Sequence, residues 1–488
     1  MTIPRQKLQL NAIRQPSAGH INIGLNRYFG EQSHRYGELE FWVEQAKILE
    51  RGNFEALFIA DVLGDFNVYK GRRDESLRTG NNVPGDDPFP AVAAMIAETR
   101  NLGFVVTGST SYELPYILAR RFTTLDRLSK GRIGWNIVTS ATDTAAQNIG
   151  RPKQLDHDER YDLADEFTEV AYKLWEYSWQ PDAVVNDRYE GLYVEASRVH
   201  EIGHRGKYFT VPGIHHAEPS PQRTPVIYQA GTSDKGRQFA ATHAEGVFLT
   251  APAPEFLRPI VEDVRARAAA LGRDPRSLRF LPAINVVVDD TDEAARYKYE
   301  KYRKYVYPEG GLSRFSSMVG YDIGQLTLDT PLEYVEVQGF RGFMEIVTKS
   351  DPNRVWTPRE LGEWFAYGDL TPIFVGSPKT VVDEIERWVE VADIDGITLV
   401  DYPLPAVFEE FVNFVVPELR RRGLVWDGYE GSTLREYHYG VGQQHVRPDH
   451  PASRHSWTVE STLPTAAVPV PEQNGAAPAE PDTQSVTP

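Results

Sequence analysis

The chain has 488 residues, 41% hydrophobic and 25% charged, which is long enough for one large α/β barrel or for several ordinary domains. Its formal net charge of −17 argues against nucleic acid or an anionic membrane as a partner, because phosphate contacts need clustered Lys and Arg. The chain contains no cysteine, which excludes disulfide bonds, thiolate nucleophiles, iron–sulfur clusters and cysteine-bound zinc.

Short apolar strands alternate with amphipathic helices along the chain. Eight strands are predicted, at 8–13, 56–61, 103–108, 132–138, 225–230, 246–251, 279–288 and 396–400. Helical stripes lie between them; Leu118, Phe122 and Leu125 share one helix face, and Gly131 follows the last turn. Strands buried on both faces with helices between them indicate a parallel sheet, and eight such units favour a (β/α)8 barrel. A doubly wound sheet is the alternative.

Two gaps between predicted strands, 139–224 and 289–395, are far longer than one helix needs. We expect them to be insertions after strands 4 and 7 that form lids or substrate walls at the C-terminal face of the barrel. The predicted divisions are a barrel over 1–427, a C-terminal extension over 428–447 and a tail over 448–488. The tail is rich in Pro, Ala, Ser and Thr, which predicts disorder.

The chain shows no membrane or export signal. No apolar run approaches the roughly 20 residues that a membrane span needs. The first residues, MTIPRQKLQLNA, lack the apolar region of a signal peptide. We therefore expect a cytoplasmic protein.

Polar residues stand where three neighbouring strands are predicted to end. Asp61, Thr107 and Asn136 follow or close the second, third and fourth strands, and such positions face the mouth of a barrel, where ligands bind. Asp61 could instead cap the loop that follows it. His20, in the loop after the first strand, is a candidate acid or base because a histidine titrates near neutral pH. A loop histidine without a role is the alternative.

The stretch PVIYQAGTS, 225–233, runs from an apolar strand into the start of a predicted helix over 234–244. Backbone N–H groups, the helix dipole and the Ser233 hydroxyl would converge there, which predicts an anion site suited to a single phosphate. The stretch nearly matches a P-loop, but Arg237 and Gln238 replace the Lys and Ser/Thr that a nucleoside triphosphate needs. Ser233 as an ordinary helix cap is the alternative.

A second candidate stretch begins at residue 156. Asp156 and Glu159 have the spacing of a capping box, so His157 and Tyr161 are predicted one turn apart on the same helix face, where they could hydrogen-bond a polar ligand. Surface or structural roles are the alternative. The string HEIGH, 200–204, matches a zinc-peptidase motif, but glycines interrupt the helix that such a site needs. A loop hairpin is favoured there, and no metal site is predicted.

The second insertion carries aromatic and basic residues that bear on the substrate. The aromatic ones predict either an apolar substrate cavity or additional core, and they are Tyr307, Phe315, Phe340 and Phe343. Two arginines, Arg314 and Arg341, are candidates for binding an anionic group, with solvated side chains as the alternative.

Four long stretches, 116–140, 157–179, 204–233 and 414–424, occur in an order that resembles a known family. Together they are similar to the bacterial-luciferase-like flavin-dependent monooxygenases, in the group with the nitrilotriacetate, dibenzothiophene-sulfone and dimethyl-sulfide monooxygenases. The residues at 82–89 and 305–312 most resemble the dimethyl-sulfide branch. The loop after the first strand departs from the family's Trp-Arg pattern and reads Leu-Asn-Arg at 25–27.

The resemblance implies a luciferase-type barrel that uses dioxygen and reduced FMN supplied by a separate NAD(P)H-dependent flavin reductase. The positions that match flavin-contacting residues of the family are Asp61, Thr107, Asn136, His157, Tyr161 and Ser233. His20 and His157 are the candidates for catalysis. The family also implies a homodimer or homotetramer and a small organic substrate, with an organosulfur compound as one candidate; the sequence does not fix the substrate. The alternatives are oxidative cleavage of riboflavin, hydride transfer with a deazaflavin, and non-catalytic flavin binding.

Overall fold

The computed structural model describes residues 7–334, 336–337, 344, 347–348, 354–401 and 403–463. Eight parallel strands close into a ring, in the order β1 (Gln9–Arg14), β2 (Ala56–Ile59), β3 (Gly103–Ser109), β4 (Ile133–Val138), β9 (Val226–Gln229), β10 (Gly246–Leu249), β11 (Arg279–Val288) and β13 (Gly396–Val400). Pairing of β13 with both β11 and β1 completes the ring. All eight predicted strands and the barrel are thereby confirmed, and the doubly wound alternative is wrong because a closed ring has no edge strand.

A further parallel strand, β12 (Ile373–Gly376), was not predicted. β11 is ten residues long, and its second half, Asn285–Val288, extends past the ring and pairs with β12. β12 is short and alternates between buried and half-buried positions, so it lacks the continuous apolar run of the ring strands.

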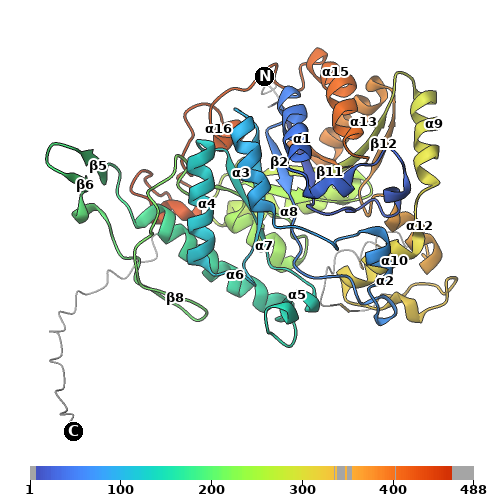
Figure 1. Ribbon diagram of the computed structural model, residues 1–488, viewed down its shortest axis with the longest axis horizontal. Helices are drawn as coiled ribbons and strands as arrows, with labels where there is room; N and C mark the ends of the chain where they lie inside the picture. Colours follow the sequence, from blue (N-terminus) through green and yellow to red (C-terminus); the bar gives the residue numbers. More distant parts are fainter. Residues whose placement is uncertain are drawn as a thin grey trace, which may run out of the picture.

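Helices surround the ring (Figure 1). They are α1 (Leu39–Arg51), α3 (Pro88–Glu98), α4 (Pro115–Ser129), α6 (His157–Tyr172), α7 (Asp234–His243), α8 (Pro254–Ala270), α13 (Pro378–Ala392), α14 (Ala406–Glu410) and α15 (Val416–Arg421). On α4, Leu118, Phe122 and Leu125 are buried against the barrel, as their spacing predicts. Lys130 and Gly131 then take positive φ angles of 61° and 94°, which end the helix.

The two insertions follow the fourth and seventh strands of the ring, as predicted. The first carries α5 (Asp143–Asn148) and two small hairpins, β5 (Val184–Asp187) with β6 (Leu192–Val194) and β7 (His204–Arg205) with β8 (Thr210–Val211). The second carries α9 (Asp292–Arg303), α10 (Pro308–Val319) and α12 (Pro358–Ala366). Phe315 is fully buried between α10 and α12, so it is core. Phe340, Arg341 and Phe343 lie outside the described residues.

A C-terminal helix, α16 (Leu434–Tyr439), closes the N-terminal end of the barrel. Leu434 and Tyr437 join the cluster of side chains inside the ring. Arg435 is fully buried and binds Glu245 at 2.8 and 3.0 Å. The barrel interior is therefore sealed at this end, which leaves the end where the strands stop as the side for ligands. The boundaries at 427 and 447 stay a prediction.

Residues 448–463 differ from the expected disorder. They contain a 3-10 helix, Pro451–His455, whose residues Pro451, Ala452, Ser453 and His455 are buried. His450 Nε2 lies 2.9 Å from the His243 carbonyl, and His455 Nε2 lies 3.0 Å from Glu169 Oε1. The contacts of His450 with α7 and of His455 with α6 thus hold residues 448–463 in place, although their composition is typical of a flexible tail. Residues 464–488 lie outside the described part of the chain. Within the described part, no helix is long and apolar enough to cross a membrane.

Candidate active site

Thr107 and Asn136 occupy paired positions on β3 and β4, and each is 3% exposed. The Thr107 hydroxyl donates to the Ile59 carbonyl at 2.8 Å and accepts from Asn136 Nδ2 at 2.9 Å. Asn136 Oδ1 has no hydrogen-bond partner among the described residues. A buried acceptor without a donor costs about 1–3 kcal/mol, so a ligand N–H or O–H at this position would be stabilised.

Asp61 lies just beyond the end of β2, beside the same mouth. Burial, together with the nearby carboxylates of Asp87 and Glu113, raises the pKa of Asp61 to about 6. Asp61 is therefore a carboxylate that accepts hydrogen bonds at neutral pH and takes up a proton under mildly acidic conditions. In the described part of the chain, no hydrogen bond joins it to the Thr107–Asn136 pair.

A second cluster surrounds the Tyr161 hydroxyl, which comes from α6. Burial raises the pKa of Tyr161, and side-chain hydrogen bonds with Ser233, Thr139 and Gln229 partly oppose that rise. These partners come from three different segments: the residue after β4, the end of β9 and the start of α7. The structure therefore brings together Tyr161 and Ser233, which are 72 residues apart in the numbering.

Two glycines leave space for this hydroxyl. A Cβ atom on Gly231 would lie 2.5 Å from the Tyr161 oxygen, and one on Gly236 would lie 2.8 Å from it. Any larger residue at either position would push Tyr161 away from Ser233. Gly231 and Gly236, which make the stretch similar to a P-loop, thus allow the Tyr161 hydroxyl to pack closely against the start of α7.

Ser233 is the N-cap of α7, and its Oγ accepts a hydrogen bond from the Gly236 N–H at 3.1 Å. The helix-cap alternative is therefore observed. It does not exclude ligand binding, because capping uses a lone pair of the hydroxyl and leaves its proton for Tyr161 or a ligand. The remaining N–H groups of the first turn and the positive end of the helix dipole also favour an anion here.

α6 begins at His157, as predicted, but without the predicted capping box: Asp156 makes no side-chain cap hydrogen bond. His157 Nδ1 lies 2.7 Å from Asp158 Oδ1, which favours the proton on that nitrogen. The His157 and Tyr161 rings are both buried, with centroids 5.3 Å apart. The two side chains therefore share a face, as their spacing predicts.

His20 contacts a residue that the sequence reasoning missed. His20 Nδ1 lies 3.3 Å from Asp401 Oδ1, and Asp401 directly follows β13. Behind this pair, the Arg14 guanidinium is fully buried 4.0 Å from the Trp42 ring centroid. Burial lowers the pKa of Arg14 to about 10, against the opposing charges of Asp401 and Glu31, so Arg14 stays charged at neutral pH.

Three site residues that the sequence analysis did not identify, Gln229, Asp401 and Thr139, occupy positions that the sequence marks. Gln229 ends β9 and Asp401 directly follows β13, and Thr107 and Asn136 lie two residues before the ends of β3 and β4, so a search for polar residues near the ends of all eight strands would have found them. Thr139 also follows a strand directly. Their partners, however, are set by the closed ring and not by local spacing.

Two other candidates have structural roles. His204 lies on β7 with Nε2 3.3 Å from Glu166 Oε1, and His200 Nε2 lies 2.9 Å from Gln180 Nε2. The HEIGH string is therefore a loop and a short strand, as favoured, and not the helix of a zinc peptidase. Arg314 is buried and donates to Asp369 at 3.0 and 3.1 Å, so it is neither solvated nor open to an anionic group.

Comparison with known proteins identifies the class. The luciferase-like monooxygenase family matches residues 25–393. The dimethyl-sulfide monooxygenase of Hyphomicrobium sulfonivorans is 42% identical over 97% of this chain and 99% of its own length. The long-chain alkane monooxygenase of Geobacillus thermodenitrificans strain NG80-2 is 45% identical over 92% of this chain and 98% of its own. A crystal structure of riboflavin lyase with modified FMN and riboflavin is 36% identical, with a TM-score of 0.86, over 92% of this chain and 100% of its own.

The chain therefore belongs to the luciferase-like monooxygenase family. It is a flavin-dependent monooxygenase built on the luciferase-type barrel, which confirms the predicted family, fold and class of enzyme.

Proposed function

We propose that the chain is the oxygenase component of a two-component system that takes reduced FMN from a separate NAD(P)H-dependent reductase and oxidises a small neutral substrate, with an organosulfur compound as the first candidate. The observation that carries the proposal is the Tyr161–Ser233 cluster at the start of α7, on the same barrel mouth as the Thr107–Asn136 pair. The sequence has no GxGxxG between a strand and a helix, so reducing equivalents come from another protein.

The side chains at the mouth fit FMN. The start of α7, the Ser233 hydroxyl and the Tyr161 hydroxyl would hold the phosphate, because they offer donors at a positive helix end. Asn136 Oδ1 and the Asp61 carboxylate are acceptors for ribityl hydroxyls or ring N–H groups. When bound, the reduced flavin supplies the two electrons with which one atom of dioxygen enters the substrate and the other leaves as water.

The chain itself supplies binding, orientation and proton handling. His157 and Tyr161 place a ring nitrogen and a hydroxyl on one buried face, where they can donate to a polar group in the mouth. Asp401 accepts from His20 Nδ1, which leaves Nε2 as the nitrogen that can hydrogen-bond a group in the mouth. The sealed lower end of the barrel keeps water from entering the site from below.

A neutral substrate fits the charges at the site. Arg314, the described arginine that was a candidate for anion binding, is already paired with Asp369. Two relatives are named for dimethyl sulfide and for long-chain alkanes, both of which are uncharged. We therefore place small sulfides and hydrocarbons ahead of aminopolycarboxylates.

An assay with a flavin reductase, NADH and FMN tests the proposal. We expect oxygen-dependent product from a small sulfide or an alkane, little from an aminopolycarboxylate, and turnover that requires the reductase or pre-reduced FMN. Turnover with NADH and FMN in the absence of any reductase would contradict the two-component reading.

Oxidative cleavage of riboflavin is the second candidate, supported by the similarity to riboflavin lyase over nearly the whole chain. Incubation of riboflavin with the same reducing system distinguishes the two. Lumichrome formation without oxidation of any sulfide or alkane would favour the lyase. Tight FMN binding without product from any of these compounds would favour a non-catalytic flavin-binding protein.

A further inference from the structure

A hairpin of the first insertion extends away from the barrel with apolar side chains in solvent. We call residues 182–198, which contain β5 and β6, the arm; Figure 1 shows it at the side of the molecule. Its exposed residues are Val185 at 44%, Tyr189 at 95%, Leu192 at 39% and Tyr193 at 56%. A two-stranded hairpin is marginally stable by itself in water, and clustered apolar side chains on a surface mark an interaction site.

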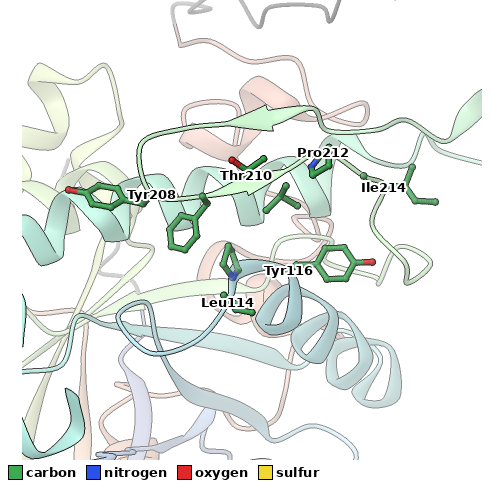
Figure 2. Close-up of a pocket in the computed structure, with 10 residues that line it drawn as sticks. Leu114, Tyr116, Tyr208, Thr210, Pro212 and Ile214 are labelled. Atoms are coloured by element: carbon green, nitrogen blue, oxygen red, sulfur yellow. The ribbon is translucent and has the colours of Figure 1, made fainter. Parts of the chain in front are cut away.

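An apolar groove lies on the outer surface of the same chain. It has a volume of about 660 Å³ and runs between the start of α4, residues 114–116, and the β7–β8 hairpin, residues 208–214. Figure 2 shows Leu114 and Tyr116 on one side of it and Thr210, Pro212 and Ile214 on the other. Leu114 is 64% exposed and Ile214 is 40% exposed, so the groove is open.

The groove has rigid walls and is separate from the barrel mouth. The N–H groups of Tyr208 and Phe209 donate to the Glu166 carboxylate of α6 at 2.9 and 2.7 Å. The Phe209 ring packs against Phe167 of α6 with centroids 5.6 Å apart. α4 and α6 belong to the outer layer of helices, so this surface lies outside the ring of strands and does not include the flavin-site candidates (Figure 1).

Charges on the arm and beside the groove have opposite sign. The arm carries four carboxylates, at Asp182, Asp187, Glu190 and Glu195, against the two guanidinium groups of Arg188 and Arg198. Beside the groove, Arg120 of α4, Arg205 of β7 and Lys207 are exposed against one exposed carboxylate, Glu201, and Glu113 is already paired with Arg121 at 2.7 Å. On a chain of net charge −17, an apolar groove beside exposed arginines favours the acidic arm of a second copy.

We propose that two copies of this chain exchange arms: the tip of each arm, around Tyr189 and Leu192, lies in the groove of the other copy. Because both surfaces belong to every chain, a two-fold axis lets each contact occur twice. A stable interface buries about 800 Å² per partner, and a reciprocal exchange doubles the area that a single arm would bury. This contact is independent of the flavin chemistry proposed above.

The mass in solution is the first test. Light scattering of the full chain should give twice its mass of 55.1 kDa. The variants Tyr189→Asp and Leu192→Asp should give the single-chain mass while their FMN affinity and thermal unfolding stay as in the unchanged protein. Tyr297→Asp, on α9 and also largely exposed at 78%, is the matched control and should keep the doubled mass. A single-chain mass for the unchanged protein, or a doubled mass for both arm variants, would overturn the proposal.

The absence of native cysteine allows a direct test of the contact. Tyr189→Cys and Ile214→Cys are prepared as separate proteins, mixed and oxidised. We expect a disulfide-linked pair of chains from this mixture, and background levels when Tyr297→Cys replaces Tyr189→Cys. If the chain is dimeric but Tyr189→Cys links no better than the control, the arm does not occupy the groove, and the assignment of the groove is wrong.

Discussion

At the scale of single residues, the site depends on how closely three segments approach the Tyr161 hydroxyl. Gly231 is needed because a Cβ there would meet both that oxygen and the Gln229 side chain. Ser233 serves at once as a helix cap and as a partner of Tyr161. The Ser233 hydroxyl would therefore contribute both to the stability of the first turn of α7 and to the binding of a phosphate.

Replacement of Gly231 tests this packing. Gly231→Ala should raise the dissociation constant for reduced FMN by about tenfold or more, because displacing Tyr161 disrupts hydrogen bonds worth about 0.5–1.5 kcal/mol each. Gly428→Ala is the matched control, since a Cβ there meets no atom within 4 Å. Titration of both variants with FMN under anaerobic, reducing conditions measures the effect. Equal affinity in the two variants would contradict the phosphate site.

Asp61 gives a prediction for pH. Its pKa is raised from 3.8 to about 6 in the folded chain, so the folded state binds the proton more tightly than the unfolded state. The stability that Asp61 contributes therefore falls as pH rises from about 4 to about 6 and is constant above that. Asp61→Asn should be more stable than the unchanged protein at pH 7, by about 1–2 kcal/mol, with the gain lost near pH 4. Urea denaturation at both pH values checks this, and weaker FMN binding should accompany it.

At the scale of elements, α16 packs against the N-terminal ends of the barrel strands. Arg435 binds Glu245 and also donates to the Thr224 carbonyl at 2.9 Å, all in a fully buried environment. Burial and the Arg435 charge have opposite effects on the pKa of Glu245, and the net result lowers it to about 2. The helix is therefore held by charge as well as by the apolar contacts of Leu434 and Tyr437.

Removal of the Arg435 charge should lower the free energy of unfolding. Arg435→Met leaves the Glu245 carboxylate buried without its partner, and loss of one member of a buried pair costs about 3–5 kcal/mol. Arg447→Ala is the control, because Arg447 forms its ion pairs with Asp274 and Asp449 near the surface and should lose at most about 1 kcal/mol. Chemical denaturation of both variants measures the two losses. Similar small losses would show that α16 is not held by this pair.

At the scale of the whole molecule, closing the ring places the last strand beside the first. His20 and Asp401 are 381 residues apart in the sequence and meet only because β13 pairs with β1. Arg14 and Glu31 lie in the same region and set the charge behind the pair. The orientation of His20 at the mouth is thus fixed by a residue far away in the sequence.

Asp401→Asn tests that support. The amide lacks the charge with which Asp401 orients the His20 ring, so kcat should fall by about 10–100-fold while the dissociation constant for FMN stays the same. Asp401→Glu keeps the charge and should recover part of the rate. An unchanged kcat in Asp401→Asn, with the fold intact by circular dichroism, would remove His20 from the proposed mechanism.

The sequence by itself determined the eight ring strands, the helix starts at His157 and Asp234 and the polar residues near the strand ends. Each of these depends on local burial and on backbone geometry, which spacing along the chain reports directly. The stretch 225–233 likewise indicated a hydroxyl-rich helix start before any contact was known.

Tertiary structure alone decided the ring order, β12, the partners of Tyr161, the Arg314–Asp369 and His20–Asp401 pairs and the packing of residues 448–463. These features depend on which distant segments lie side by side. The periodicity of the sequence indicates that a residue is buried, but it does not indicate which segment that residue contacts. The expected tail shows the physical reason clearly. Its composition predicts flexibility because it has few large apolar side chains. In the folded chain, however, His450 and His455 contact α7 and α6, and these contacts hold the segment in place.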